Sequence, residues 1–328
     1  MITALLTLIP AVVCSYLLTP LVLKLARRFD VIDHPDERRV HARPTPRWGG
    51  LAIYLAFMAA VLVTVAIHPQ VGFDAQVLGV LLGGTVIAAV GLIDDKYNLS
   101  PLVQIAAIFA AGFVLIAFGV KIAYISKPFG AINLHWLAIP VTLVWVLGVT
   151  KTVDLMDGLD GLAAGICAIA SATLLVMTFR ELDPAWSAPH KELVRSFVTV
   201  RIFSSALLGA SLGFLRFNYP PARIFMGTIG AQFMGFVVAS ASMIGAFKVA
   251  ALVAMAVPLL VLAIPILDTA FVVVRRITGG RRVYEPDKSH VHHRLLERGL
   301  SHGQAIWVIY ALTGALSAVG LVIYWCSK

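Results

Sequence analysis

The feature that most constrains this chain is a series of apolar runs, each about twenty residues long, that recur along its length. An α-helix of about twenty apolar residues is long enough to cross the ~30 Å hydrocarbon core of a bilayer. The composition agrees with this reading, because 59% of the 328 residues are hydrophobic, 13% are charged and the mean hydropathy is +0.90. A soluble fold could bury one such run, but about ten of them indicate a polytopic membrane protein.

We therefore predict an all-α fold, a membrane-embedded bundle of about ten transmembrane helices that forms a single domain over residues 1–328. The expected spans lie near residues 3–25, 49–68, 75–93, 101–120, 135–153, 159–178, 197–215, 229–247, 250–274 and 305–325. The polar motifs fall in inner connecting loops at residues 26–48, 94–100, 151–161, 216–230 and 275–304.

The basic residues are distributed unevenly between the two faces of this predicted bundle. With the N-terminus outside, roughly two thirds of the 26 Lys and Arg residues fall on the inner side, in agreement with the positive-inside rule. The net charge of +9 therefore belongs mainly to one face, where it suits anionic lipid head groups and phosphorylated substrates. Nucleic acid is disfavoured as a partner, because the basic segments are short loops between spans.

An acidic pair, Asp94-Asp95, directly follows the third predicted span. Two adjacent carboxylates at a membrane boundary are costly unless they meet cations, which favours a metal-binding or proton-transfer role. The alternative is that they are solvated, or that they cap the helix expected to begin near Ser100-Pro101. The sequence leaves both readings open.

A second acidic motif contains Asp154, Asp157 and Asp160, which recur at every third position. On a helix these carboxylates would lie along one side, but the interleaved glycines favour a broken turn. Acids at this depth are functional by default, because desolvating them is expensive. A calcium-binding loop is excluded, since the segment has too few spaced oxygen ligands and no terminal bidentate Glu.

Two further inner loops carry polar side chains with open roles. Asn218 precedes a pair of prolines and could contact a base or a sugar, although an ordinary turn explains the segment equally well. His290, His292, His293 and Arg294 could form a metal site or a solvated loop. Histidines beside arginines favour phosphate binding instead, because both donate hydrogen bonds to anions.

Acidic groups, a basic rim and a membrane boundary together suggest phosphoryl transfer between a soluble nucleotide sugar and a lipid phosphate. That reaction needs mainly Mg²⁺ to neutralise the pyrophosphate and residues that hold the reactants in line. A phosphate nucleophile is largely ionised at neutral pH, so a strong base is unnecessary, although Asp94 or Asp95 could remove a residual proton.

The ordered motifs resemble those of the polyprenyl-phosphate N-acetylhexosamine-1-phosphate transferases, glycosyltransferase family 4. The motifs are Asp33, Pro35, Arg38, His41 and Gly49-Gly50; Gly91, Ile93 and Asp94-Asp95; Asp157-Gly158 and Asp160-Gly161-Leu162; Asn218 and Pro221-Ala222; Phe225-Met226-Gly227; and His290, His292-His293-Arg294 with Leu295-Leu296. The resemblance covers nearly the whole chain. It is strongest to the undecaprenyl-phosphate GlcNAc-1-phosphate transferases that start O-antigen (lipopolysaccharide) or wall teichoic acid synthesis in cell wall biogenesis.

This resemblance implies a multi-pass enzyme of the bacterial inner (plasma) membrane with a cytoplasmic active site. The implied donor is a UDP-sugar such as UDP-GlcNAc, the acceptor is undecaprenyl or another polyprenyl phosphate, and the products are UMP and a lipid-linked sugar. The implied cofactor is Mg²⁺, with Mn²⁺ as a substitute, and a homodimer is compatible with the fold. The implied catalytic residues are Asp94, Asp95, His290, His292 and His293, and the substrate-binding residues are Asp157, Asp160, Asn218, Arg294 and Lys151.

Four positions depart from the family pattern. Thr228 stands where the family has a metal-binding Asp, Asp154 and Lys151 stand in place of two Asn residues, and Gln104 stands where a basic residue is expected. In one account the carboxylate has moved, so that Asp154 and Thr228 together bind the metal, because threonine is a Mg²⁺ ligand in other phosphate sites. In the other account Thr228 disables the metal site and leaves a pseudoenzyme.

A different class of function, a carrier of lipids or nucleotide sugars, is the remaining alternative. Transporters of this kind often show inverted repeats and charged groups at the bilayer midplane. No inverted repeat is visible in this sequence, and the acidic groups cluster at one face. We therefore rank the enzyme above the carrier.

Overall fold

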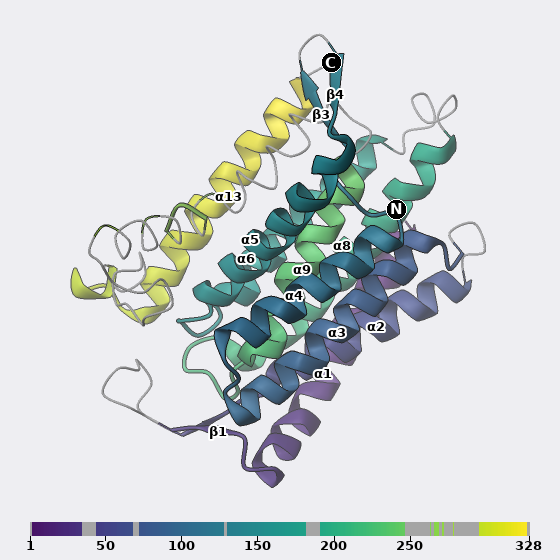
Figure 1. Cartoon of the computed structure of the whole chain (residues 1–328). Helices are drawn as coiled ribbons and strands as arrows, with labels where there is room; N and C mark the ends of the chain where they lie inside the picture. Colours follow the sequence, from purple (N-terminus) through teal and green to yellow (C-terminus); the bar gives the residue numbers. More distant parts are fainter. Residues whose placement is uncertain are drawn as a thin grey trace.

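The computed structural model is a bundle of long helices that run along a common direction (Figure 1). It describes residues 2–34, 44–67, 72–127, 130–181, 191–246, 263, 266–268, 271, 278 and 295–326. The main helices are α1 (Ile2–Arg28), α2 (Gly49–Ile67), α3 (Ala75–Tyr97), α4 (Pro101–Ala117), α5 (Ala138–Met156), α6 (Leu162–Glu181), α8 (Lys191–Asn218), α9 (Gly227–Ala246) and α13 (His302–Cys326).

Two short antiparallel strand pairs and a 3-10 turn complete the described elements. Strand β1 (Ile32–Asp33) pairs with β2 (Thr45–Pro46), and β3 (Tyr124–Lys127) pairs with β4 (Gly130–Asn133). The 3-10 turn η1 (His135–Leu137) leads into α5. The two strand pairs lie at opposite ends of the bundle in Figure 1.

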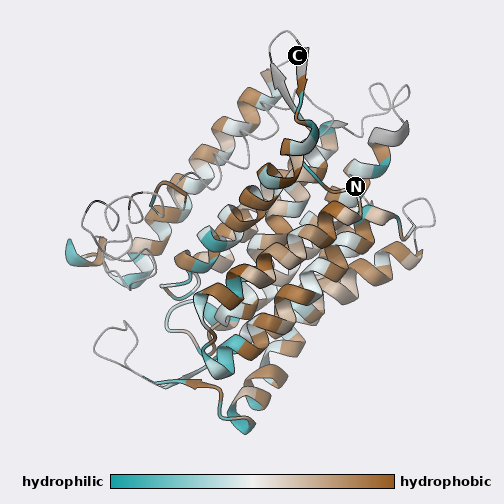
Figure 2. Cartoon of the chain, in the orientation of Figure 1, coloured by the Kyte–Doolittle hydropathy of each residue, from teal (hydrophilic) through white to brown (hydrophobic). Residues whose placement is uncertain are grey.

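The length and hydropathy of the helices confirm the predicted polytopic membrane fold. Within the described residues, eight helices are long and apolar enough to span a bilayer, and α4 is a shorter apolar helix. Figure 2 shows hydrophobic residues along the helices and hydrophilic residues gathered toward their ends. The span predicted near residues 250–274 lies mostly outside the described residues.

Helix α9 occupies the centre of the bundle, whereas α1 lies at its edge. In the most apolar stretch of α9, 89% of the residues are buried inside the protein, compared with 28% in α1. A helix that is apolar on all sides belongs inside a protein or a membrane, and α9 is surrounded by other helices. The start of α9 is therefore a fixed reference point inside the bundle.

Small residues and hydrogen bonds join α1 to α8. A Cβ atom added at Gly209 would lie 2.5 Å from the Leu8 carbonyl oxygen, and one at Gly213 would lie 2.5 Å from that of Val12. Between these contacts, the Ser15 hydroxyl donates to the Ala210 carbonyl at 2.7 Å. Lipid tails are as apolar as leucine, so close packing and hydrogen bonds are what hold membrane helices together.

The helices extend further than the apolar runs indicate, which corrects the predicted boundaries of the inner loops. Asp94 and Asp95 lie inside α3, and Lys151 and Asp154 lie inside α5, rather than in loops at 94–100 and 151–161. Hydropathy locates the apolar part of a helix only. A helix continues past it when its polar side chains find partners within the protein, as these do.

The other predicted loops are also partly regular structure. In the segment 26–48, α1 continues to Arg28 and the β1–β2 pair follows. In the segment 216–230, α8 ends at Asn218 and α9 begins at Gly227. Most of the segment 275–304 lies outside the described residues.

Candidate active site

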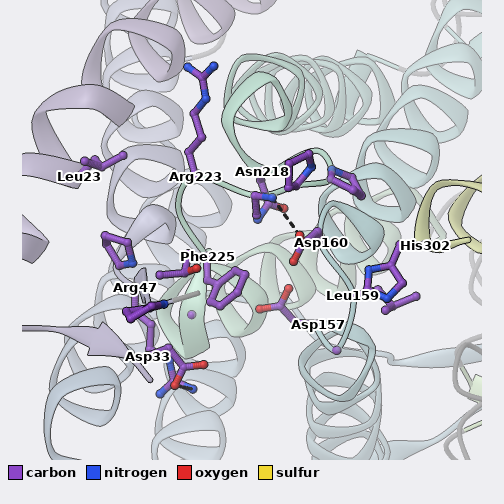
Figure 3. A pocket seen from close by; sticks show the side chains of 18 of the residues that line it. Leu23, Asp33, Arg47, Asp157, Leu159, Asp160, Asn218, Arg223, Phe225 and His302 are labelled. Carbon is purple, nitrogen blue, oxygen red and sulfur yellow. Dashed lines mark hydrogen bonds and ion pairs between the residues drawn. The ribbon is translucent and has the colours of Figure 1, made fainter. Parts of the chain in front are cut away.

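A cavity of about 1290 Å³ lies at the β1–β2 end of the bundle (Figure 3). Its acidic lining residues are Asp33, Asp95, Asp154, Asp157 and Asp160, and its basic lining residues are Arg27, Arg47, Arg223 and His302. Leu23, Thr45, Asn218, Phe225, Gly227 and Thr228 are among the other lining residues. Carboxylates and guanidinium groups therefore line one cavity, an arrangement that suits a phosphate ligand bound together with a metal ion.

The acidic pair is divided between two environments, although both side chains are only 6% exposed. Asp95 lines the cavity and accepts hydrogen bonds from the backbone N–H groups of Thr228 at 2.8 Å and Ile229 at 3.4 Å. These N–H groups begin α9, where unpaired donors and the helix dipole favour an anion. Gly227 has a φ of +71°, and a Cβ atom there would overlap the Asp95 carboxylate, so only glycine allows this approach.

Asp94 is not among the residues that line the cavity, and it stabilises the turn into α4. Its Oδ1 accepts from the Leu99 backbone N–H and from the Gln104 side-chain amide, both at 2.9 Å. The Asp94 carboxylate does not cap α4, because Leu99 precedes the N-cap residue Ser100 and that helix start has no side-chain cap hydrogen bond. Asp94 instead supports the backbone just before Ser100-Pro101. Adjacent residues on a helix point about 100° apart, which is why the two carboxylates have different partners.

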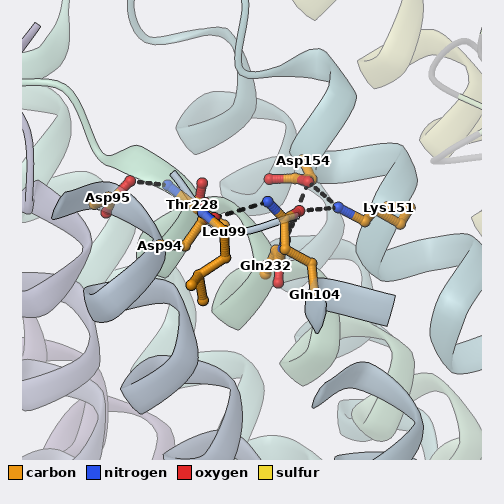
Figure 4. A network of polar contacts seen from close by, with 8 residues as sticks. All are labelled: Asp94, Asp95, Leu99, Gln104, Lys151, Asp154, Thr228 and Gln232. Atoms are coloured by element: carbon orange, nitrogen blue, oxygen red, sulfur yellow. Dashed lines mark hydrogen bonds and ion pairs between the residues drawn. The ribbon is translucent and has the colours of Figure 1, made fainter. Parts of the chain in front are cut away.

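Gln104 connects Asp94 to a second acidic group through a network of side chains (Figure 4). Its Oε1 accepts from the Lys151 ammonium at 2.5 Å and from the Gln232 amide at 3.1 Å. Lys151 also forms an ion pair with Asp154 at 2.7 Å, and Gln232 donates to the same Asp154 oxygen at 3.2 Å. Gln104 and Asp154 are thus joined through Lys151 and Gln232, and positions 104, 151 and 154 are three of the four that the sequence analysis predicts to differ from the family pattern.

The acidic turn after α5 is the broken turn that its glycines predict. The helix ends at Met156, and Gly161 closes the turn with a φ of +78°. The Asp160 carboxylate accepts from the Ala222 backbone N–H at 2.9 Å, which fastens the turn to the loop between α8 and α9. Asp157 points into the cavity in Figure 3, and within the described part of the chain its carboxylate accepts no hydrogen bond.

Both polar atoms of the Asn218 side chain form hydrogen bonds with the backbone. Its Oδ1 accepts from the Gly161 N–H at 3.0 Å, its Nδ2 donates to the Ile224 carbonyl at 3.0 Å, and it is 2% exposed. These contacts hold the acidic turn against the α8–α9 loop. Direct binding of substrate by Asn218 stays a prediction.

The last helix, α13, is attached to the same acidic turn. The Tyr310 hydroxyl donates to the Gly161 carbonyl at 2.5 Å, and the Trp307 indole donates to the Tyr219 hydroxyl at 3.0 Å. This attachment places His302, at the start of α13, in the lining of the cavity. The sequence analysis did not single out His302, although a histidine just before an apolar run on the inner face was a usable signal.

Arg47 is a second residue that the sequence analysis did not assign to the site. Strand β2 pairs with β1, and Phe225 donates its N–H to the Pro46 carbonyl at 2.9 Å, which holds Arg47 at the cavity. Its guanidinium lies 3.3 Å from the Asp33 carboxylate. Long-range pairing of this kind cannot be read from local sequence.

The carboxylates in the cavity repel one another. Burial raises the pKa of Asp157 well above the usual range of an aspartic acid, and the nearby carboxylates of Asp154 and Asp95 raise it further. The Arg47 guanidinium opposes this by lowering the same pKa. A carboxyl group in such surroundings favours either a proton or a bound cation.

The donor set fits a divalent cation that is shared with a substrate. Within the described residues, no group of three or more His, Cys, Asp or Glu converges as a complete metal cage. Mg²⁺ is usually held by one or two carboxylates together with substrate phosphates and water, so a complete cage is not required. Asp154 and Thr228 line the same cavity, whereas His290, His292, His293 and Arg294 lie outside the described residues.

Comparison with known proteins links this site to one family. Residues 77–246 match the family model described as glycosyl transferase family 4. A probable undecaprenyl-phosphate N-acetylglucosaminyl 1-phosphate transferase of Bacillus subtilis is 34% identical, over 94% of this chain and 81% of that protein. A decaprenyl-phosphate N-acetylglucosaminephosphotransferase of Mycobacterium leprae is 35% identical over 94% and 80%, and a phospho-N-acetylmuramoyl-pentapeptide-transferase of Shouchella clausii is 30% identical over 94% and 92%.

Proposed function

Because this chain belongs to glycosyl transferase family 4, we propose that it transfers GlcNAc 1-phosphate from UDP-GlcNAc to a polyprenyl phosphate and releases UMP. The observation that carries this proposal is one cavity in which aspartates from α3, α5 and the acidic turn lie together with arginines from α1, the residue after β2 and the α8–α9 loop. The names of the Bacillus and Mycobacterium relatives supply the sugar and the lipid.

The proposed reaction exchanges one phosphoanhydride bond for another. An oxygen of the acceptor phosphate bonds to the phosphorus that carries the sugar, and the bond from that phosphorus to the bridging oxygen of UMP breaks. The acceptor is already mostly ionised at neutral pH, so positioning and charge neutralisation dominate. Of the acidic pair we assign the removal of a residual proton to Asp95, because it lines the cavity, and a supporting role to Asp94.

We assign the binding of Mg²⁺, or of Mn²⁺ in its place, to Asp154 and Thr228, with Asp157 beside them. The cation would neutralise the pyrophosphate and the departing UMP. Asp157, Asp160, Asn218 and Lys151 are proposed to bind or to position the donor. His290, His292, His293 and Arg294 are proposed to contact phosphate or sugar, as the family resemblance implies.

The cavity is proposed to face the cytoplasm of a bacterial cell, with the bundle in the inner (plasma) membrane. The excess of Lys and Arg that the sequence predicts for the inner loops supports that orientation, because positive residues are retained inside. A nucleotide-sugar donor would be available on that side. The lipid-linked product would then start a cell-envelope glycan.

The direct test uses the full-length protein in lipid nanodiscs with UDP-GlcNAc, undecaprenyl phosphate and Mg²⁺. We expect UMP and a lipid-linked GlcNAc pyrophosphate to form in equal amounts, and both to require the lipid acceptor. An absence of UMP with Mg²⁺, Mn²⁺ and Co²⁺ would reject catalysis.

A second candidate function is a metal-altered pseudoenzyme or a nucleotide-sugar carrier. One observation favours it, the pairing of Asp154 with Lys151, and the family resemblance adds the expectation of a carboxylate where Thr228 stands. Calorimetry with UDP-GlcNAc separates the two proposals. Binding without UMP release would support the second one.

A further inference from the structure

Lys151 is the one described side chain in the Figure 4 network that carries a positive charge. Its ammonium donates to Gln104 and Asp154, which leaves one of its three N–H groups over. The side chain is 23% exposed and that of Asp154 is 17% exposed, so the ion pair is largely removed from water. An ion pair in this setting is screened less by solvent than one on the surface.

The two oxygens of Asp154 have different surroundings. Oδ2 accepts both the Lys151 ammonium and the Gln232 amide, whereas Oδ1 accepts no hydrogen bond from the described residues. Asp154 lines the cavity, but Lys151 is not among the lining residues. Lys151 therefore reaches the cavity only through Asp154.

We propose that Lys151 is a positioning residue that sets how tightly the site holds its divalent cation. The inference rests on the proposed function, because it takes Asp154 as a cation ligand. Lys151, with Gln104 and Gln232, fixes Oδ2 toward the protein and presents Oδ1 to the cavity. The ammonium also repels a dication at Oδ1, so the cation binds weakly until a pyrophosphate adds its own negative charge.

The test measures Mn²⁺ binding by electron paramagnetic resonance, on the full-length protein in nanodiscs without substrates. Lys151→Gln keeps an amide that can bond to Gln104 and Asp154 but removes the charge, and it should bind Mn²⁺ about tenfold more tightly. Lys151→Arg, which keeps the charge, should bind like the wild type. Asp154→Asn removes the ligand and should weaken binding by about tenfold or more.

A charge control and a hydrogen-bond control separate the local effect from general ones. Lys24→Gln makes the same charge change on an exposed residue of α1 outside the cavity lining, and it should shift Mn²⁺ affinity less than twofold. Gln232→Met removes a neutral donor to Asp154 and should also have a small effect. Lys151→Met is a second neutral variant, for use if Lys151→Gln does not fold.

The inference is overturned if the neutral Lys151 variants bind Mn²⁺ as weakly as the wild type, or more weakly, in folded protein. The transfer reaction provides an independent readout, because the Mg²⁺ concentration for half-maximal UMP release should fall by the same factor in Lys151→Gln. A wild-type protein that releases no UMP would reject the proposed function. A wild-type protein that releases UMP, with no tighter Mn²⁺ binding in the variants, would reject this inference alone.

Discussion

The two ends of the bundle use buried charge in opposite ways. At the end away from the cavity, Arg201 donates to the Thr178 hydroxyl at 3.1 Å and to the Thr178 carbonyl at 2.9 Å, and its guanidinium lies 4.7 Å from the centre of the Phe179 ring. Arg180 likewise donates to the Tyr324 carbonyl near the end of α13. Cations at the carboxyl ends of helices are stabilised by the helix dipole.

At the cavity end, aspartates accept hydrogen bonds from backbone N–H groups instead. Asp95 accepts from the first N–H groups of α9, and Asp160 accepts from Ala222. Two neighbouring carboxylates differ from these arginines, because Asp157 and the Oδ1 atom of Asp154 accept no hydrogen bond from the described residues. The arginines at the far end join helices to one another, whereas some carboxylate oxygens in the cavity can still accept a hydrogen bond or bind a cation.

The largest expected effect is at Asp95. Asp95→Asn keeps an oxygen that can accept from Thr228 but removes the charge and the proton acceptor, so UMP release should fall by about 10²–10⁴-fold. Asp94→Asn is the matched control, and its main effect should be a lower unfolding temperature, because Asp94 supports the α3–α4 turn. A larger activity loss in Asp94→Asn would reverse the roles assigned to the pair.

Gly227→Ala tests whether the backbone approach at Asp95 matters. The positive φ and the overlap with the Asp95 carboxylate should cost about 1–3 kcal/mol of stability and displace that carboxylate, reducing UMP release by at least about tenfold. Gly148→Ala, in α5, meets no atom within 4 Å and should leave activity and unfolding temperature nearly unchanged. Equal behaviour of the two variants would contradict this account.

Arg201→Met should destabilise the contact between α6 and α8 at the far end of the bundle without changing the cavity. Loss of its hydrogen bonds to Thr178 should lower the free energy of unfolding by about 1–3 kcal/mol. UMP release should stay within twofold of the wild type at a temperature where thermal unfolding shows both proteins to be fully folded. A large loss of activity in fully folded Arg201→Met would remove the distinction between the two ends.

The smallest expected effect is a pH dependence of stability in metal-free protein. Because the pKa of Asp157 is raised in the folded state, its protonated form stabilises the fold at low pH, and this contribution is lost as pH rises through the raised pKa. Unfolding temperature in EDTA should therefore decline above the usual titration range of an aspartic acid. Asp157→Asn should remove that part of the decline, and an unchanged pH profile would argue against the repulsion described in the cavity.

The fold was largely predictable, because spanning a bilayer forces about twenty apolar residues into each helix. The acids Asp95, Asp154, Asp157 and Asp160 were also found from sequence, since charge near apolar runs is rare and conspicuous. Their placement on one cavity depends on helix packing, which the sequence does not display. The roles assigned to them remain predictions.

What the sequence could not provide was the partner of each polar group. Nothing in the adjacent positions 94 and 95 indicates that one bonds to Gln104 and the other to the start of α9. The partners of Asn218 and Arg47 likewise come from other parts of the chain. Hydropathy averaged over a span also misses the polar end of a helix that continues beyond its apolar part, so the predicted loops begin before the helices end.

The attachment of α13 has a consequence for biosynthesis. Tyr310 bonds to Gly161 across 149 positions of the chain, so the acidic turn lacks this support until α13 has been translated and inserted. Nascent chains in which only α1 to α9 have been translated would contain the aspartates but not the part of the cavity lining that α13 supplies. Completion of the cavity would thus coincide with late membrane insertion.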